Sequence, residues 1–218
     1  MGQIQHVLDP ILNKHYVCPQ GVLGRFVGEL MVRQHAPETT WTVAIADVQP
    51  ADCVLEIGFG AGKAIQLLAE KATHGSVYGI DLSATMVKRA RERNAQAVRA
   101  GRVILQQGEA THLPFEAQQF DKVISIHTFY WWAEDPHSIL TEMYRVLKPG
   151  GKLLFTFANA KEGVERDYYD QTFIEEHAFS PMKSIGFTEI TSQRGPLSRQ
   201  FKILAVIGTK SSASTSSG

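Results

Sequence analysis

Three glycines alternate with other residues directly after an acidic residue, in the run Glu56-Ile57-Gly58-Phe59-Gly60-Ala61-Gly62. Glycine has no Cβ, so the backbone of such a turn can take a positive φ and let a ligand lie against it. A helical pattern follows at once, and the start of a helix offers unpaired N–H groups and a partial positive charge. Glu56 can accept hydrogen bonds from a polar ligand. The run therefore predicts a strand, a tight turn and a helix that together bind such a ligand.

The spacing of these glycines separates the ligand classes that use such turns. A dinucleotide site requires G-x-G-x-x-G, but Lys63 stands at the sixth position. A P-loop requires G-x-x-x-x-G-K-[ST], but Ile57 stands at its first glycine and Ala64 at its hydroxyl position. What remains is E-x-G-x-G-x-G. A glycine-rich turn with no cofactor is the alternative interpretation.

Asp81 follows the next predicted strand, Ser76–Ile80, nineteen residues past the third glycine. A carboxylate at this place can accept hydrogen bonds from both hydroxyls of a ribose. Leu82 and Met86 would offer apolar contact to an adenine face. The alternative is that Asp81 only assists Ser83, the predicted N-cap of the following helix.

Gly108 and Glu109 follow a third predicted strand, Val103–Gln106. An acid here can accept a hydrogen bond from an adenine amino group. The alternative is a solvated loop acid, because most surface carboxylates have no special role.

Four consecutive aromatic residues, Phe129 to Trp132, follow a fourth predicted strand, Lys122–Ile126. Trp131 and Trp132, with Tyr16, are the candidates for walls of a substrate pocket, and a tryptophan can also face a cationic methyl group. The alternative is that two of the four aromatics belong to the core and two anchor the loop. His127 is the candidate general base, since its pKa lies near neutrality, with an ordinary hydrogen-bonded histidine as the alternative.

Composition bounds the classes of partner. The chain has 218 residues, which suits one domain, and 22 basic residues balance 22 acidic ones. A net charge near zero gives no reason to expect nucleic acid or an anionic membrane as partner. The eight histidines show no i, i+4 pair and the two cysteines no C-x-x-C pattern, so no metal is expected.

The cysteines and the chain ends bear on location. Cys18 and Cys53 cannot build a disulfide framework, which favours a reducing cytoplasm. We expect neither a signal peptide nor a stable membrane insertion, because no apolar run is long enough. The tail over residues 210–218 is rich in serine and is expected to be disordered.

Strands and helices alternate through the middle of the chain. The strands are short apolar runs rather than alternating ones, as in parallel sheets buried on both faces. The pattern predicts an α/β fold with a doubly wound, mostly parallel sheet. The predicted strands are Cys53–Ile57, Ser76–Ile80, Val103–Gln106, Lys122–Ile126 and Lys152–Phe157, and the helices between them are Ala61–Lys71, Ser83–Arg99 and Pro136–Leu147.

The two ends of the chain carry weaker patterns. Helices over about Gly24–His35 and Thr39–Asp47 form a predicted lid in residues 1–50. Near the other end, Asp167–Ile185 looks helical, with an interruption at Pro181. Two strands, Phe187–Thr191 and Phe201–Ile207, are expected to form a hairpin around Gly195-Pro196.

The order of these stretches strongly resembles the class I methyltransferases of small-molecule type (type 11-like), which use S-adenosylmethionine. The resemblance covers about residues 52–157 and implies a methyltransferase domain over residues 51–209. It implies a Rossmann-like sheet of seven strands in the order 3-2-1-4-5-7-6, with strand 7 antiparallel. The stretches that carry it are Glu56–Gly62, Gly79–Ser83, Gly108–Ala110 with Leu113–Phe115, Phe120–Ser125 and Arg145–Gly151.

The resemblance also implies roles for individual residues. Glu56 and the backbone of the three glycines would hold the methionine end of the cofactor, Asp81 the ribose, and Glu109 with Ala110 the adenine edge. Ile126 and His127 would complete the cofactor site. The family more often has Asp where Glu109 stands, and Lys63 is unusual at a helix start.

Three functions are consistent with these features. The first is methyl transfer from S-adenosylmethionine to a small-molecule or lipid-like acceptor, since the D/N-P-P-Y pattern of nucleic-acid amino methylation is absent after the fourth strand. The second is a methyltransferase-like protein that binds the cofactor without turnover. The third is a NAD(P)-dependent oxidoreductase. The sequence leaves the acceptor, the methylated atom and the oligomeric state open.

Overall fold

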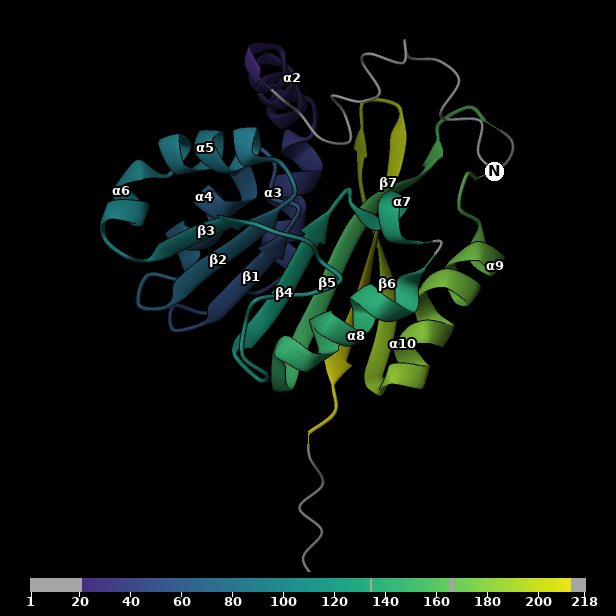
Figure 1. Cartoon of the computed structure of the whole chain (residues 1–218). Coiled ribbons are helices and arrows are strands. Elements are labelled where there is room, and N and C mark those ends of the chain that lie inside the picture. The colour runs from purple at the N-terminus through teal and green to yellow at the C-terminus, as the bar shows by residue number, and fades with distance from the viewer. Residues whose placement is uncertain (1–20, 134, 165–166, 213–218) are drawn as a thin grey trace, which may run out of the picture.

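The computed structural model describes residues 21–133, 135–164 and 167–212, which form one sheet covered by helices on both faces (Figure 1). The seven strands lie in the order β3-β2-β1-β4-β5-β7-β6; β7 runs antiparallel to β5 and β6 on its two sides, and the other neighbouring pairs are parallel. The strands are β1 Cys53–Ile57, β2 Ser76–Asp81, β3 Val103–Gln107, β4 Phe120–Ile126, β5 Leu147–Lys161, β6 Phe187–Ser198 and β7 Phe201–Lys210. The predicted fold class and strand order are confirmed.

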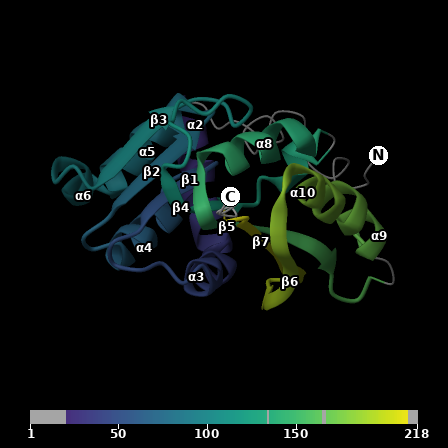
Figure 2. The same ribbon diagram turned by 90° about the horizontal axis from the view of Figure 1, so that it is seen from below.

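Helices pack on both sides of this sheet, with α3 and α4 on one face and α8 and α10 on the other (Figure 2). The described helices are α2 Gly21–Gln34, α3 Ala36–Ile45, α4 Lys63–Lys71, α5 Ala84–Arg93, α6 Ala95–Arg99, α7 Phe129–Trp132, α8 Pro136–Val146, α9 Gln171–Ile174, the π-helical turn η1 Glu175–Phe179 and α10 Ser180–Ile185. None of these described helices is long and apolar enough to cross a membrane.

Each face of the sheet has its own hydrophobic core, because successive side chains of a strand point to opposite faces. In β1, Leu55 and Ile57 pack toward α8, whereas Val54 packs toward α4. In β5, Phe155 likewise belongs to the core on the α8 side, and Leu154 to the core on the α4 side. Burial on both faces explains why these strands read as continuous apolar runs.

One predicted helix is divided in two. Ser83 caps α5 as predicted, since its Oγ accepts a hydrogen bond from the Met86 N–H at 3.3 Å. The helix then breaks at Asn94, whose buried amide donates to the carbonyls of Gly62 (3.0 Å) and Ala90 (2.9 Å). The chain continues as α6.

The C-terminal hairpin differs from the prediction. Gly195 and Pro196 lie inside β6, and the turn falls at Arg199, which has a φ of 56°. The pairing of β6 with β7 shifts between Arg194 and Leu197, around the proline. The predicted loop was wrong because β6 is an edge strand, where the missing N–H of a proline breaks no ladder hydrogen bond.

The predicted helical interruption at Pro181 was also wrong. Helical structure runs without a gap from Gln171 to Ile185, with a π-helical turn directly before the proline's helix. Pro181 lies in the first turn of α10. A proline removes one hydrogen bond to the preceding turn, and here that turn is π-helical, so the chain accommodates Pro181 by a local change of helix type without a gap.

Candidate active site

A cavity of about 450 Å³ opens at the carboxyl ends of β1, β2 and β4, under α2. In a doubly wound sheet this is the edge where ligands bind. The predicted cofactor residues that line it are Glu56, Gly58, Gly60, Asp81, Leu82, Met86, Gly108, Glu109, Ala110, Ile126 and His127. Trp131 and Trp132 line it too, whereas Tyr16 lies outside the described residues. The structure thus brings together all the predicted site residues that it describes except Gly62.

The three glycines of the turn have positive φ values but different surroundings. A Cβ on Gly62 would lie 2.6 Å from the Ala90 Cβ, and a Cβ on Gly58 would clash with the Thr128 side chain. A Cβ on Gly60 would meet no atom within 4 Å. Gly62 therefore serves the close packing of α4 on α5, and it is not among the residues that line the cavity. Gly60 faces open space.

Asp81 ties the glycine turn to the start of α5. Its Oδ2 accepts a hydrogen bond from the Gly60 N–H at 2.8 Å, and its Oδ1 accepts one from the Ser83 N–H at 2.8 Å. Burial raises the pKa of Asp81, against these two hydrogen bonds. Each carboxylate oxygen has two lone pairs, so both oxygens can still accept from a ligand. The predicted capping role and the predicted ligand role are therefore compatible.

Glu56 is a buried acid with an incomplete set of partners. Its side chain is 2% exposed, and its Oε2 has no hydrogen-bond partner among the described residues. Burial, together with the nearby Asp81, raises the pKa of Glu56 to about 8. An unpaired buried carboxyl oxygen is costly. A donor or a cation placed in the cavity would satisfy it.

The adenine-side candidates also line the cavity. Glu109 is exposed, and its carboxylate makes no hydrogen bond to any residue that the structure describes. Leu82 is 53% exposed, whereas Met86 is buried. Lys63 also lines the cavity and donates to the Gln66 Oε1 at 3.3 Å.

The four aromatic residues form α7, a short helix that the sequence pattern did not predict. Phe129 and Trp132 are buried in the core, and the Tyr130 hydroxyl accepts a hydrogen bond from the Ala158 N–H at 2.6 Å. Trp131 is 53% exposed and lines the cavity. The interpretation in which two of the four aromatic residues belong to the core therefore fits better than one in which all of them face a ligand. Of the four rings, that of Trp131 is the most available to a ligand.

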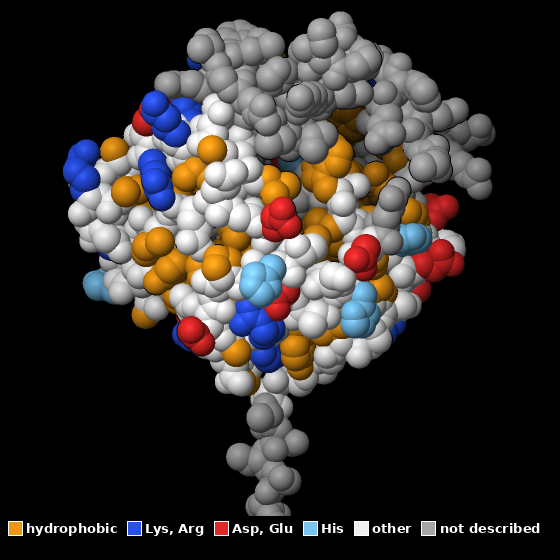
Figure 3. All heavy atoms as spheres, in the orientation of Figure 1, with side chains coloured by type: hydrophobic (Ala, Val, Ile, Leu, Met, Phe, Trp, Pro, Cys, Tyr) orange, Lys and Arg blue, Asp and Glu red, His pale blue; other side chains and the backbone are white. Residues whose placement is uncertain are grey.

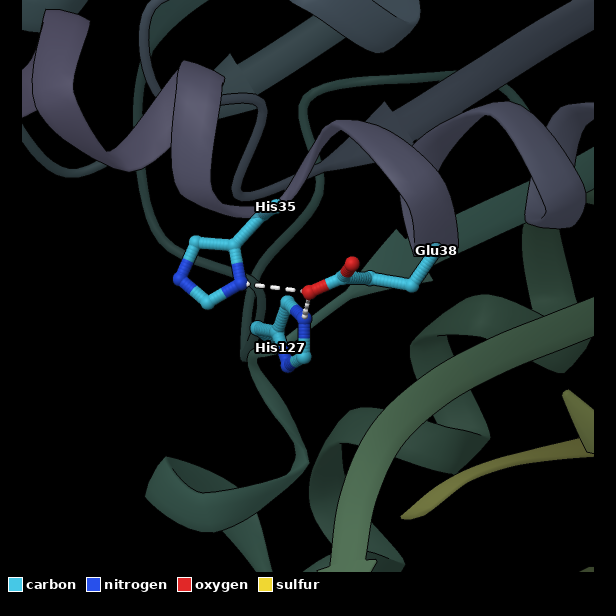
Figure 4. A group of neighbouring side chains, drawn as sticks. All are labelled: His35, Glu38 and His127. Carbon is cyan, nitrogen blue, oxygen red and sulfur yellow. Dashed lines mark hydrogen bonds and ion pairs between the residues drawn. The ribbon is translucent and has the colours of Figure 1, made fainter. Parts of the chain in front are cut away.

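A cluster of His35, Glu38 and His127 lies beside the cavity (Figure 4). The Glu38 Oε1 lies 2.6 Å from the His35 Nδ1 and 3.1 Å from the His127 Nε2. The second nitrogen of His127, Nδ1, lies 3.1 Å from the Tyr130 hydroxyl. Both ring nitrogens of His127 are therefore engaged, so a role as general base would require one of these bonds to break.

Burial and hydrogen bonding act against each other in this cluster. Burial alone would raise the pKa of Glu38, but the hydrogen bonds from His127 and His35 lower it well below its usual range. Burial lowers the pKa of His127, against its hydrogen bond to Glu38. Glu38 is thus an ionised carboxylate, and its Oε2 has no hydrogen-bond partner in the described chain. The i, i+3 spacing of His35 and Glu38 was the signal in the sequence, but only folding brings His127 to them.

Comparison with known proteins identifies the family. A sequence profile described as "Methyltransferase domain" matches residues 55–155. The uncharacterized methyltransferase YdaC of Bacillus subtilis is 33% identical over 129 residues, which is 59% of this chain and 68% of that protein. A demethylmenaquinone methyltransferase of Lactiplantibacillus plantarum is 41% identical over 102 residues, but this covers 46% of this chain and 43% of that protein.

A solved structure supports the fold. A chain of the Haemonchus contortus phosphoethanolamine N-methyltransferase 2 in complex with S-adenosyl-L-methionine matches with a TM-score of 0.64 and 19% identity. The match covers 86% of this chain and 57% of that chain. The oxidoreductase alternative has no support in these matches. The chain belongs to the class I methyltransferase family, whose cofactor is S-adenosylmethionine.

Proposed function

We propose that this protein transfers a methyl group from S-adenosylmethionine to a small-molecule or lipid-like acceptor. The observation that carries the proposal is the mixed lining of the cavity, with acids at the strand ends and apolar side chains on two helices. The strand ends supply Glu56 and Asp81, whereas α2 and α7 supply Met31, Val32 and Trp131. Pockets for small ligands are mostly apolar, with a few placed polar groups.

The surface supports a small acceptor rather than a nucleic acid. On the face drawn in Figure 3, Lys and Arg side chains form separate small groups, at the upper left and below the centre, and no continuous patch. On the basic helix α5, Arg89 and Arg93 both pair with Glu29 of α2, and Arg91 donates to the Leu105 carbonyl. These arginines are therefore used inside the protein, and a phosphate backbone would have to compete for them.

The residues at the strand ends fit the cofactor. The unpaired Oε2 of Glu56 suits the ammonium group of the methionine end, and the open space beside Gly60 admits a chain against the backbone. The remaining lone pairs of Asp81 suit the ribose hydroxyls. Glu109 and Ala110 line the same cavity and would contact the adenine edge.

When bound, the cofactor supplies an electrophilic methyl carbon on a sulfonium. The task of the protein is then mostly alignment, which can contribute up to about 7–11 kcal/mol in well-oriented reactions. Residues 1–50 would act as the helical lid that holds the acceptor in line. In the described part of that segment, Gly28, Met31 and His35 line the cavity, and α2 is held to α5 by Glu29.

Two measurements test the proposal. Isothermal titration compares S-adenosylmethionine with NADH, and we expect only the first to bind. Labelled methyl transfer is then measured to two probes, reduced demethylmenaquinone as an apolar acceptor and phosphoethanolamine as a charged amine. We expect transfer to the apolar probe and none to the amine.

Each outcome has a distinct meaning. Cofactor binding without transfer to any apolar acceptor in a wider metabolite panel would favour a cofactor-binding protein without turnover. Transfer to phosphoethanolamine alone would contradict the proposed acceptor class. Binding of NADH but not of S-adenosylmethionine would overturn the cofactor assignment.

A further inference from the structure

Glu38 determines where the protons sit on two histidines. It is 0% exposed, and hydrogen bonds hold its pKa well below the usual range, so the carboxylate is ionised and can only accept. The same oxygen, Oε1, contacts the His35 Nδ1 and the His127 Nε2. Both histidines must therefore donate to it. This assigns the Nδ1–H tautomer to His35 and the Nε2–H tautomer to His127.

The second nitrogens of the two rings have different surroundings. On His127, Nδ1 accepts from the hydroxyl of Tyr130, whose oxygen itself accepts from the Ala158 N–H. On His35, Nε2 has no hydrogen-bond partner among the described residues, and it points away from Glu38 (Figure 4). His35 lines the cavity. The lone pair available to a ligand is therefore on His35.

The remaining charged neighbour does not change this assignment. Arg199, in the β6–β7 turn, lies with one guanidinium nitrogen 3.4 Å from the His35 Nδ1. Glu38 is closer to the same atom, at 2.6 Å, and carries the opposite charge. Since Nδ1 donates its proton to Glu38, it cannot also accept from Arg199.

We propose that His35 is the general base of the methyl transfer, held by Glu38 as its positioning residue, and that the acceptor is one that loses a proton from oxygen or from an acidic carbon. This rests on the proposed function. The acceptor's O–H or C–H proton goes to the His35 Nε2, and the acceptor's electron pair forms the bond to the methyl carbon. The methyl–sulfur bond breaks with its electrons going to sulfur. Glu38 stabilises the imidazolium that results, as a carboxylate does in a catalytic triad.

A bound divalent cation is the competing use of the same side chains. One atom from each of His35, Glu38 and His127 lies within 4.8 Å of the others, and two histidines with one carboxylate suit zinc or iron. Both histidine nitrogens, however, contact Glu38 Oε1, so this oxygen stands where the ion would have to bind (Figure 4). The geometry favours the hydrogen-bonded arrangement.

The tautomers can be measured without knowing the acceptor. Long-range ¹H–¹⁵N NMR of the full chain with S-adenosylhomocysteine, at pH 8, is expected to show His35 as Nδ1–H and His127 as Nε2–H. In Glu38→Gln, the carboxylate that accepts from both histidine rings is removed, so the preference of His35 for the Nδ1–H tautomer should weaken. Should Glu38→Gln fail to fold, the wild-type pattern decides alone. The Nε2–H tautomer on His35, or zinc bound to its Nδ1, would overturn the proposal.

Transfer to reduced demethylmenaquinone tests the base itself. His35→Ala should lower kcat about 10²-fold or more and abolish the acidic limb of the pH profile, while affinity for S-adenosylhomocysteine stays within about twofold. The exposed His137→Ala is the matched control and should leave all three unchanged. If the wild type binds no S-adenosylmethionine, the proposed function fails. If it binds and transfers, and His35→Ala keeps its kcat and pH profile, only the His35 proposal fails.

Discussion

Cofactor binding should expel a proton from Glu56. Burial, with Asp81 nearby, raises the pKa of this carboxyl to about 8, so at pH 7 about nine-tenths of the ligand-free protein carries it protonated. A cation beside a carboxylate favours the ionised form. The ammonium group of S-adenosylmethionine or S-adenosylhomocysteine would be that cation. We therefore expect the release of about 0.9 proton per bound ligand at pH 7.

The size of the effect on affinity follows from the ionised fraction of the free protein. With a pKa of about 8, this fraction is about 1% at pH 6, about 9% at pH 7 and about one half at pH 8. If only the ionised form binds, the association constant rises about fiftyfold from pH 6 to pH 8, or about 2.3 kcal/mol. Affinity therefore falls as the pH drops below 8 and levels off above it.

Calorimetry of S-adenosylhomocysteine binding in two buffers of different ionisation enthalpy counts the released protons. Glu56→Gln cannot ionise, so its pH dependence reports only the remaining groups, including the amino group of the ligand. The exposed Glu176→Gln should behave as the wild type. Equal proton release by the wild type and Glu56→Gln would refute the reasoning.

Four other changes have measurable outcomes. In urea unfolding of the ligand-free protein, the stability of Glu56→Gln relative to the wild type should be greater at pH 9 than at pH 5, by up to about 5 kcal/mol. The reason is that the raised pKa of Glu56 makes the wild type lose stability as the pH rises from 4.5 through 8. Asp81→Asn should weaken S-adenosylhomocysteine binding about 10- to 100-fold by calorimetry, since the NH2 group of the amide replaces one of the two accepting oxygens. Unchanged affinity would mean that the ribose binds elsewhere. Gly60→Ala should mainly impair cofactor binding, whereas Gly62→Ala should mainly lower the Tm, and the reverse pattern would contradict the assigned surroundings. Glu29→Gln should speed cofactor release in stopped-flow by no more than about fivefold, because its two arginine pairs are partly exposed; an unchanged release rate would argue against α2 as a lid.

Local signals along the chain account for much of the fold. The strand Cys53–Ile57 is as predicted, because a short apolar run between turn residues has little choice of structure. Ser83 caps its helix as expected from its hydroxyl and its place after a strand. Glu56 and Asp81 reach one cavity because parallel strands bring their carboxyl ends to the same edge.

Other features depend on what packs against a residue rather than on its type. Gly62 belongs to the same motif as Gly60, yet Ala90 of α5 occupies the space beside it. The hairpin turn falls at Arg199 rather than at the Gly195–Pro196 pair, because β6 is an edge strand that tolerates a bulge.

The sequence by itself determined the alternation of strands and helices, the glycine turn and the acids at the strand ends, since each depends on residues close together in the chain. Only the tertiary structure decided which of His35 and His127 has a ring nitrogen with no partner among the described residues. Glu38 and His127 are 89 positions apart, and no local pattern links them. Their contact exists because α3 packs on one face of the sheet with its first turn beside the end of β4, so that one buried carboxylate meets both rings.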